Sequence, residues 1–130
     1  MDDKKNVVLV VEDELPLLEA IKIKLTKSGF SVVTARSVEQ AVNHIQDIGK
    51  VDAIWLDHYL LGKENGLDFV VKCKSDNSWC RHIPIFVVSN TASAEKVQAY
   101  LQLGVSKYYV KAEKRLDEII KEMTEEIAKQ

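Results

Sequence analysis

Five polar residues whose side chains could take part in phosphoryl chemistry each stand at the end of a short apolar run. They are Glu12 and Asp13 after residues 7–11, Asp57 after 53–56, Ser89 after 85–88, and Lys111 after 107–110. In an open sheet of parallel strands, ligands bind beyond the carboxyl ends of the strands. If these runs are neighbouring strands, the five side chains meet at one edge of a sheet.

Three carboxylates placed together repel one another, and each raises the pKa of the others. A divalent cation removes this repulsion, and a few carboxylates with retained water molecules are typical ligands of Mg²⁺. Such a cation stabilises charge on a transferring phosphoryl group. An aspartate can act as the nucleophile, while a lysine and a hydroxyl can bind phosphoryl oxygens. The set therefore contains a metal site, a nucleophile, a cation and a hydroxyl, which together favour phosphoryl transfer.

The elements that must position these residues follow from the spacing of apolar side chains. Val7–Val11 is β-branched and nearly continuous, which is typical of a strand covered on both faces. The same kind of run predicts strands at 7–11, 31–35, 53–56, 85–88 and 107–110. Helical spacing predicts five helices between and after them, and the last has the clearest apolar stripe. The residues of that stripe are Leu116, Ile119, Ile120, Met123 and Ile127.

Capping residues support the predicted helix boundaries. Pro16 suits the first turn of the first helix and Gly29 its end. Ser37 and Gln40 have the spacing of a capping box at the start of the second helix. Five β–α units in succession imply an α/β fold, with a parallel sheet, right-handed crossovers and helices on both faces. We find no composition shift that would mark a linker, so residues 1–130 are predicted to form a single domain.

Composition and charge exclude several classes of protein. The net charge of −2 provides no basic excess for binding nucleic acid. The longest purely apolar run, Val7–Val11, is far too short to cross a bilayer. The N-terminus lacks the apolar segment of a signal peptide. Two cysteines, Cys73 and Cys80, do not make a disulfide framework. We therefore expect a cytoplasmic protein with reduced cysteines.

Four segments in order resemble the receiver domain family of two-component response regulators. They are Val-Leu-Val-Val-Glu12-Asp13-Glu, Ala-Ile-Trp-Leu-Asp57, Ile-Pro-Ile-Phe-Val-Val-Ser89 and Leu-Gly104-Val-Ser-Lys-Tyr108-Tyr-Val-Lys111. The resemblance covers essentially the whole chain. It is specific because the four segments occur in order and the polar residues of each stand at the end of a different predicted strand. It implies a doubly wound (βα)5 three-layer sandwich, flavodoxin-like, with strand order 2-1-3-4-5.

The resemblance also implies a role for each residue. Asp57 would accept a phosphoryl group from a phosphohistidine on a histidine kinase or phosphotransfer protein. Asp13 and Asp57 would bind Mg²⁺ directly, Glu12 through water, and Tyr59 through its backbone carbonyl. Lys111 would contact the phosphoryl group, Ser89 would move to bond it, and Tyr108 would act as the switch aromatic. The changed face would then bind a downstream target or effector domain, and the domain would catalyse only its own phosphorylation and dephosphorylation.

The sequence departs from the family pattern at several positions. Ala112 follows Lys111, where the family usually has a proline; a cis bond before a non-proline residue costs about 3 kcal/mol, so we expect a trans bond. Leu61 stands where a proline is common, in a loop about one residue longer than usual. Tyr59 and Thr91 flank the acceptor, where they could influence how long the phosphoryl group persists.

Other functions fit these residues less well or remain open. Phosphatases of the haloacid dehalogenase type carry a second aspartate two residues after the nucleophile, and here that position is Tyr59. A flavin- or nucleotide-binding protein would need a glycine-rich loop after the first strand. The spacing of His58, Cys80 and His82 matches no zinc pattern. A degenerate receiver that binds partners without phosphate remains an alternative, and the sequence does not distinguish a lone receiver from part of a longer chain.

Overall fold

The computed structural model describes residues 5–75, 78, 80–91 and 93–129. Within these residues, strands and helices alternate along the chain. The elements are β1 (Val7–Val11), α1 (Leu15–Lys27), β2 (Ser31–Ala35), α2 (Val38–Ile48), β3 (Ala53–Leu56), α3 (Gly66–Lys74), β4 (Ile85–Ser89), α4 (Ala94–Gln102), β5 (Lys107–Val110) and α5 (Leu116–Ala128).

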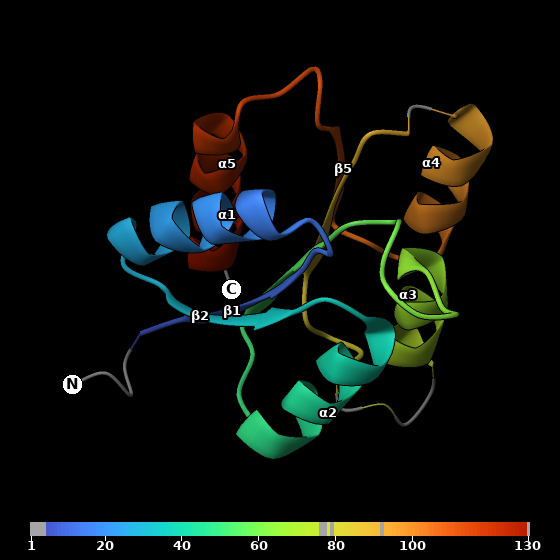
Figure 1. Cartoon of the computed structure of the whole chain (residues 1–130), viewed down its shortest axis with the longest axis horizontal. Coiled ribbons are helices and arrows are strands. Elements are labelled where there is room, and N and C mark those ends of the chain that lie inside the picture. The colour runs from blue at the N-terminus through green and yellow to red at the C-terminus, as the bar shows by residue number, and fades with distance from the viewer. Residues whose placement is uncertain (1–4, 76–77, 79, 92, 130) are drawn as a thin grey trace.

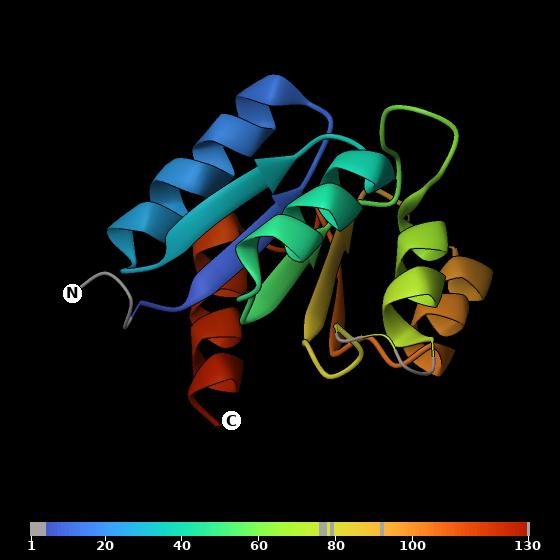
Figure 2. The same cartoon turned by 90° about the horizontal axis from the view of Figure 1, so that it is seen from below.

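The strands form one parallel sheet with the order β2-β1-β3-β4-β5 (Figures 1 and 2). The central strands are short and wholly buried, since every residue of β3 and β4 is covered. The doubly wound (βα)5 sandwich with strand order 2-1-3-4-5 is therefore confirmed. The order reverses at β1 and β3, and ligands of such folds bind at this switch point.

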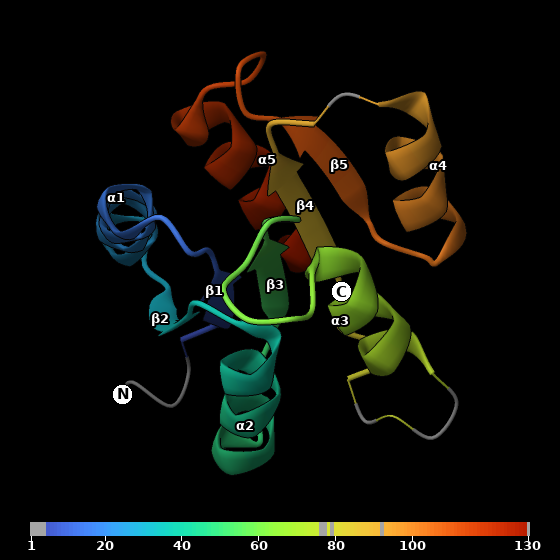
Figure 3. The ribbon, with the colours of Figure 1, turned by 45° about the vertical axis from the view of Figure 1, so that its right-hand side comes forward.

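Helices cover both faces of the sheet, as predicted. Helices α1 and α5 lie on one face, and α2, α3 and α4 lie on the other (Figure 3). Successive residues of a strand point to opposite faces, so Val10 and Trp55 pack with α1 and α5. Leu9 and Ile54 pack with the other three helices. No helix in the described part of the chain has both the length and the apolar composition that a bilayer span requires.

Local sequence signals account for most helix boundaries. Pro16 lies in the first turn of α1, as predicted. The hydroxyl of Ser37 accepts a hydrogen bond from the amide of Gln40 and caps α2. The Gln40 side chain accepts instead from the amide of Arg36, at 2.7 Å, so the reciprocal half of the predicted capping box falls one residue earlier.

The two cysteines differ from the prediction. Cys73 lies at the end of α3, and the chain then turns back to place Cys80 beside it. Their Cα atoms are 5.4 Å apart and their sulfur atoms are paired as a disulfide. The expectation of two reduced cysteines is wrong for this structure. The two cysteines are seven residues apart in sequence, and this spacing alone does not predict that both side chains are buried in the same part of the core.

Candidate functional site

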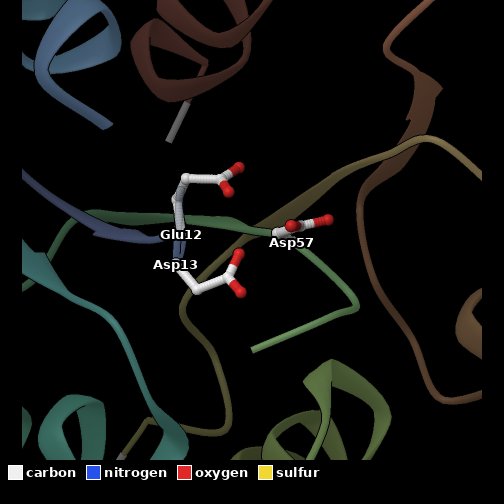
Figure 4. Close-up of side chains that lie close together, drawn as sticks. All are labelled: Glu12, Asp13 and Asp57. Atoms are coloured by element: carbon white, nitrogen blue, oxygen red, sulfur yellow. The ribbon is translucent and has the colours of Figure 1, made fainter. Parts of the chain in front are cut away.

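Three carboxylates meet where β1 and β3 end, at the switch point of the sheet. Val11 pairs with Leu56 across these strands, so Glu12 and Asp57 leave the sheet side by side. One oxygen from each of Glu12, Asp13 and Asp57 lies within 4.8 Å of the others (Figure 4). Glu12 is fully buried and Asp57 is 4% exposed. The predicted convergence of these carboxylates is present in the structure.

Burial controls the electrostatics of this cluster. Removal from water, together with the neighbouring charge of Asp57, raises the pKa of Glu12 to about 7. Burial likewise raises the pKa of Asp57, although Lys111 opposes the shift. A cluster that is costly to ionise without a cation is a suitable place for one to bind.

Lys111 supplies the cation of the predicted set. Its Nζ donates to Glu12 at 2.9 Å and lies 3.4 Å from Asp57. Burial lowers the pKa of Lys111, but the hydrogen bond to Glu12 and the charge of Asp57 outweigh this and leave the pKa raised. Its backbone amide donates to the carbonyl of Ser89 at 2.8 Å, which fixes the end of β5 to β4. The peptide bond to Ala112 is trans, as expected.

The donor set fits Mg²⁺. Its atoms are carboxylate oxygens, the hard ligands that this ion prefers, and the cluster is the only group of its kind among the described residues. The histidine and cysteine side chains named as a possible zinc set are not gathered there. His58 is hydrogen-bonded to Tyr100, and Cys80 is paired with Cys73. The ligand role of the Tyr59 carbonyl remains a prediction.

Ser89 and Tyr108 converge on the segment after β4. Ser89 is fully buried, and its hydroxyl accepts from the amide of Thr91 at 3.4 Å. The hydroxyl of Tyr108 donates to the carbonyl of Thr91 at 2.7 Å. Both predicted switch residues therefore hold the same loop residue, and Val87 pairs with Tyr108 across β4 and β5. Their movement on phosphorylation remains a prediction.

Two neighbours of the acidic cluster were not identified from the sequence as site residues. Nε and one terminal nitrogen of Arg36 donate to the carbonyl of Asp13, at 3.1 and 2.7 Å. His58 donates its backbone amide to Asp57 at 2.8 Å, and its ring is buried against Tyr100. Arg36 reaches the site from the end of β2, so no spacing within one segment could have revealed it.

The long loop after β3 is anchored at both ends. The amide of Leu61 donates to the carbonyl of Arg36 at 3.1 Å, and Leu61 forms an isolated bridge with Ser37. The amide of Gly66 donates to the carbonyl of His58 at 2.8 Å. Tyr59, two residues before Leu61, is 55% exposed, and its hydroxyl accepts from Nζ of Lys96 at 3.0 Å. The exposed side chain of Tyr59, two residues after Asp57, is therefore held by Lys96 of α4.

Comparisons with known proteins agree on one family. The family model of the response regulator receiver domain matches residues 8–124. The chain is 33% identical over 109 residues to the alginate biosynthesis transcriptional regulatory protein AlgB of Pseudomonas putida, covering 84% of the chain and 23% of that protein. It is 33% identical over 104 residues to the phosphate regulon transcriptional regulatory protein PhoB of Escherichia coli, covering 80% of the chain and 44% of PhoB. The chain thus spans less than half the length of both regulators.

A solved structure gives the same fold. The CheY-like response regulator receiver domain protein of Methanospirillum hungatei superposes with a TM-score of 0.86 at 18% identity, covering 97% of the chain and 96% of that protein.

Proposed function

The chain belongs to the response regulator receiver domain family, and from this premise we propose that it is a receiver switched by phosphorylation of Asp57. Its phosphoryl donor would be a phosphohistidine on a histidine kinase or histidine phosphotransfer protein. Residues 1–130 would act as one cytoplasmic receiver domain. The observation that carries the proposal is the contact of one half-buried lysine, Lys111, with both Glu12 and Asp57 in a cluster of three carboxylates.

The chain's own residues account for the transfer. An oxygen of Asp57 would form a bond to phosphorus while the phosphorus–nitrogen bond breaks and its electron pair leaves on the imidazole. The Asp57 carboxylate is oriented by the amide of His58, which donates to one of its oxygens at 2.8 Å. Lys111 lies 3.4 Å from the other oxygen and could hold a phosphoryl oxygen once the group is attached.

A bound Mg²⁺ would supply charge neutralisation for the phosphoryl group. Asp13 and Asp57 would hold it directly and Glu12 through water, with the carbonyl of Tyr59 as a further ligand. The mutual distances of the three carboxylates support this assignment.

The output would be a changed binding face. Ser89 and Tyr108 both bond to Thr91, so a hydroxyl drawn towards a phosphoryl group would release one of two bonds on that residue. The segment after β4 leads directly into α4. A downstream target or effector domain would then read the new arrangement of α4, β5 and α5. The chemistry performed by the domain would be limited to its own phosphorylation and dephosphorylation.

The test is incubation with Mg²⁺ and acetyl phosphate, followed by intact mass measurement. The parent protein is expected to gain one phosphoryl group, and Asp57→Asn is expected to gain none. Asp47→Asn, an exposed carboxylate on α2, is the matched control and should label like the parent. Chelation of the metal should abolish labelling. A parent that stays unlabelled would favour the phosphate-independent binding module, and labelling that survives in Asp57→Asn would move the acceptor elsewhere.

A further inference from the structure

The paired cysteines lie at the end of α3 that is farther from the acidic cluster. Helix α3 begins at Gly66, whose amide donates to the carbonyl of His58 at 2.8 Å, and Cys73 lies in the last turn of the same helix. Cys80 follows where the chain turns back towards β4. The pair is therefore separate from the carboxylates and Lys111, and it has no part in the phosphoryl chemistry proposed for them.

The turn that brings the cysteines together is held by contacts other than the bond between their sulfur atoms. Nζ of Lys74 donates to the carbonyls of Arg81 and Ile83, at 2.8 and 3.0 Å. The amide of Ile83 donates to the carbonyl of Cys80 at 3.1 Å. These hydrogen bonds join the end of α3 to the residues just after Cys80, and none of them depends on the oxidation state of sulfur. The fold should therefore keep the two side chains together after reduction.

Each sulfur atom also has a hydrogen-bond acceptor on the other cysteine. Sγ of Cys73 lies 3.1 Å from the carbonyl oxygen of Cys80, and Sγ of Cys80 lies 3.5 Å from the carbonyl oxygen of Cys73. In the reduced protein, each thiol can donate to the carbonyl that it faces, so neither buried S–H group is left without a partner. The same local structure thus accommodates both the disulfide and the dithiol.

A groove of about 220 Å³ between α2 and α3 opens beside the pair, and Cys73, Ser78 and Cys80 belong to its lining. The two helices lie next to each other on one face of the sheet (Figures 1 and 3). The hydroxyl of Ser78 lies 3.2 Å from Sγ of Cys80, where it can donate to a thiolate. Cys73 lies at the C-terminus of α3, where the partial negative charge of the helix end disfavours a thiolate. Cys80 is therefore the better nucleophile of the two.

We propose that Cys73 and Cys80 form a reversible redox pair that exchanges with low-molecular-weight disulfides such as oxidised glutathione. The thiolate of Cys80 attacks one sulfur of the small disulfide, forms a mixed disulfide and releases one glutathione. Cys73 then attacks Sγ of Cys80 and releases the second glutathione. Two electrons pass from the protein to the small disulfide, and the two thiol protons end on the released glutathione molecules. In the cytoplasm, where the proposed function places the chain, most disulfides that occur are transient and redox-sensing.

Equilibration of the protein with mixtures of reduced and oxidised glutathione tests the proposal. After acid quenching and alkylation of free thiols, intact mass separates the dithiol, the mixed disulfide and the protein disulfide. The folded protein should pass from dithiol to disulfide in one reversible transition. In urea, the ratio of disulfide to dithiol in the same mixture should fall at least about tenfold, because the fold no longer holds the sulfur atoms together. Equal ratios in folded and unfolded protein, or a mixed disulfide as the main product, would overturn the proposal.

Two lysines of α3 provide a matched comparison. Lys74→Ala removes both hydrogen bonds that close the turn, so the ratio of disulfide to dithiol in the folded protein should fall about fivefold or more. Lys72→Ala removes a lysine of the same helix that pairs with Glu64 at 2.8 Å instead, and it should leave the ratio unchanged. Equal ratios in Lys74→Ala and the parent would contradict the role of the turn in holding the pair.

Single cysteine variants test which sulfur reacts first. With oxidised glutathione, Cys73→Ser should form a mixed disulfide at Cys80 at least about tenfold faster than Cys80→Ser forms one at Cys73. The reverse order would overturn the assigned roles. Circular dichroism establishes that each variant is folded, and the equilibrium of the parent remains decisive if one is not. None of these measurements involves Asp57, Mg²⁺ or phosphate, so their outcome is independent of the proposed function.

Discussion

Nδ1 of His58 lies 2.6 Å from the hydroxyl of Tyr100, and both side chains are buried. This hydrogen bond joins the residue after Asp57 to α4. Tyr100 also lies against Tyr108, with ring centroids 5.7 Å apart. Burial lowers the pKa of His58, and the charge of Lys96 adds to the effect, so the ring is held in its neutral form. The contact ties the end of β3, where the proposed acceptor Asp57 lies, to the helix that the switch is expected to move.

Tyr100→Phe should therefore destabilise the protein by about 1–3 kcal/mol, because it leaves a buried ring nitrogen without its partner. Urea unfolding measures the loss. Tyr109→Phe is the matched control: its hydroxyl donates to Glu122, which also pairs with Lys114 at the surface, so a smaller loss is expected. In a double-mutant cycle with His58→Leu, the double variant should lose less stability than the sum of the losses in the two single variants. Strictly additive losses would show that the bond carries no coupling.

Gly66→Ala should also destabilise the fold, for a steric reason. A Cβ at Gly66 would lie 2.6 Å from the carbonyl oxygen of Asp57 and 2.6 Å from the hydroxyl of Tyr100. Forcing an atom into such a site costs about 1–3 kcal/mol. The measurement is urea unfolding of Gly66→Ala alone and with Tyr100→Phe. Removing the Tyr100 hydroxyl relieves one of the two contacts. Tyr100→Phe should therefore destabilise the Gly66→Ala protein less than it destabilises the parent. An unchanged cost would contradict the geometry.

The sequence predicted the convergence of the polar side chains because that convergence follows from periodicity and chain order. Once the strands are parallel, their carboxyl ends share one edge, and the pairing of Val11 with Leu56 places Glu12 beside Asp57. The contact between Lys111 and the acidic cluster follows from the same rule, since β5 ends at that edge. Strand order itself came from the family resemblance, because spacing alone does not say which strands are neighbours.

Contacts between side chains and distant backbone were not predictable in this way. Arg36 reaches the carbonyl of Asp13 from another strand, and no pattern within either segment marks the pair. His58 was considered only as a metal ligand, because its burial against Tyr100 depends on how α4 packs. Cys73 and Cys80 meet only because the chain reverses after α3. Each case depends on tertiary packing that spacing along the sequence does not encode.

Glu12 should make the metal-free protein less stable as pH rises. Burial raises its pKa from an ordinary 4.5 to about 7, so the folded state binds a proton more tightly than the unfolded chain. This contribution to the free energy of unfolding is fully present below pH 4.5 and is lost as pH rises through 7. The loss should be up to about 3 kcal/mol.

Urea unfolding across this pH range, with and without Mg²⁺, measures the effect of Glu12. Glu12→Gln should flatten the profile in the absence of metal, and Asp57→Asn separates the contribution of the second raised carboxyl. Because Mg²⁺ would bind the ionised carboxylates, its addition should restore stability most strongly at the alkaline end. Metal-free parent protein whose stability falls with rising pH no more than that of Glu12→Gln would contradict the assignment.

Arg36→Ala should weaken Mg²⁺ binding by about tenfold or more. Substituting a residue that orients a metal ligand typically lowers metal affinity by this factor. The guanidinium holds the carbonyl of Asp13 with two hydrogen bonds. Calorimetric titration of the metal is the measurement. Arg36→Lys keeps the charge but cannot make both bonds, so it should fall between the parent and alanine. If lysine restores the parent affinity fully, the effect is one of charge alone and the positioning role is rejected.

Tyr59→Ala should shorten the lifetime of the phosphoryl group on Asp57. The Tyr59 ring stands two residues after the acceptor, and Lys96 holds it both through the hydroxyl at 3.0 Å and over the ring face at 5.0 Å. A ring held in this way would hinder the approach of water to the phosphoryl group. The decay of labelled protein after removal of the donor measures the lifetime. Tyr59→Phe keeps the ring but loses the hydrogen bond, and Lys96→Ala removes both contacts while leaving the ring. If shielding by the ring governs the lifetime, Tyr59→Ala should decay fastest, with Tyr59→Phe close to the parent and Lys96→Ala between them; equal lifetimes in the parent and Tyr59→Ala would reject the shielding role.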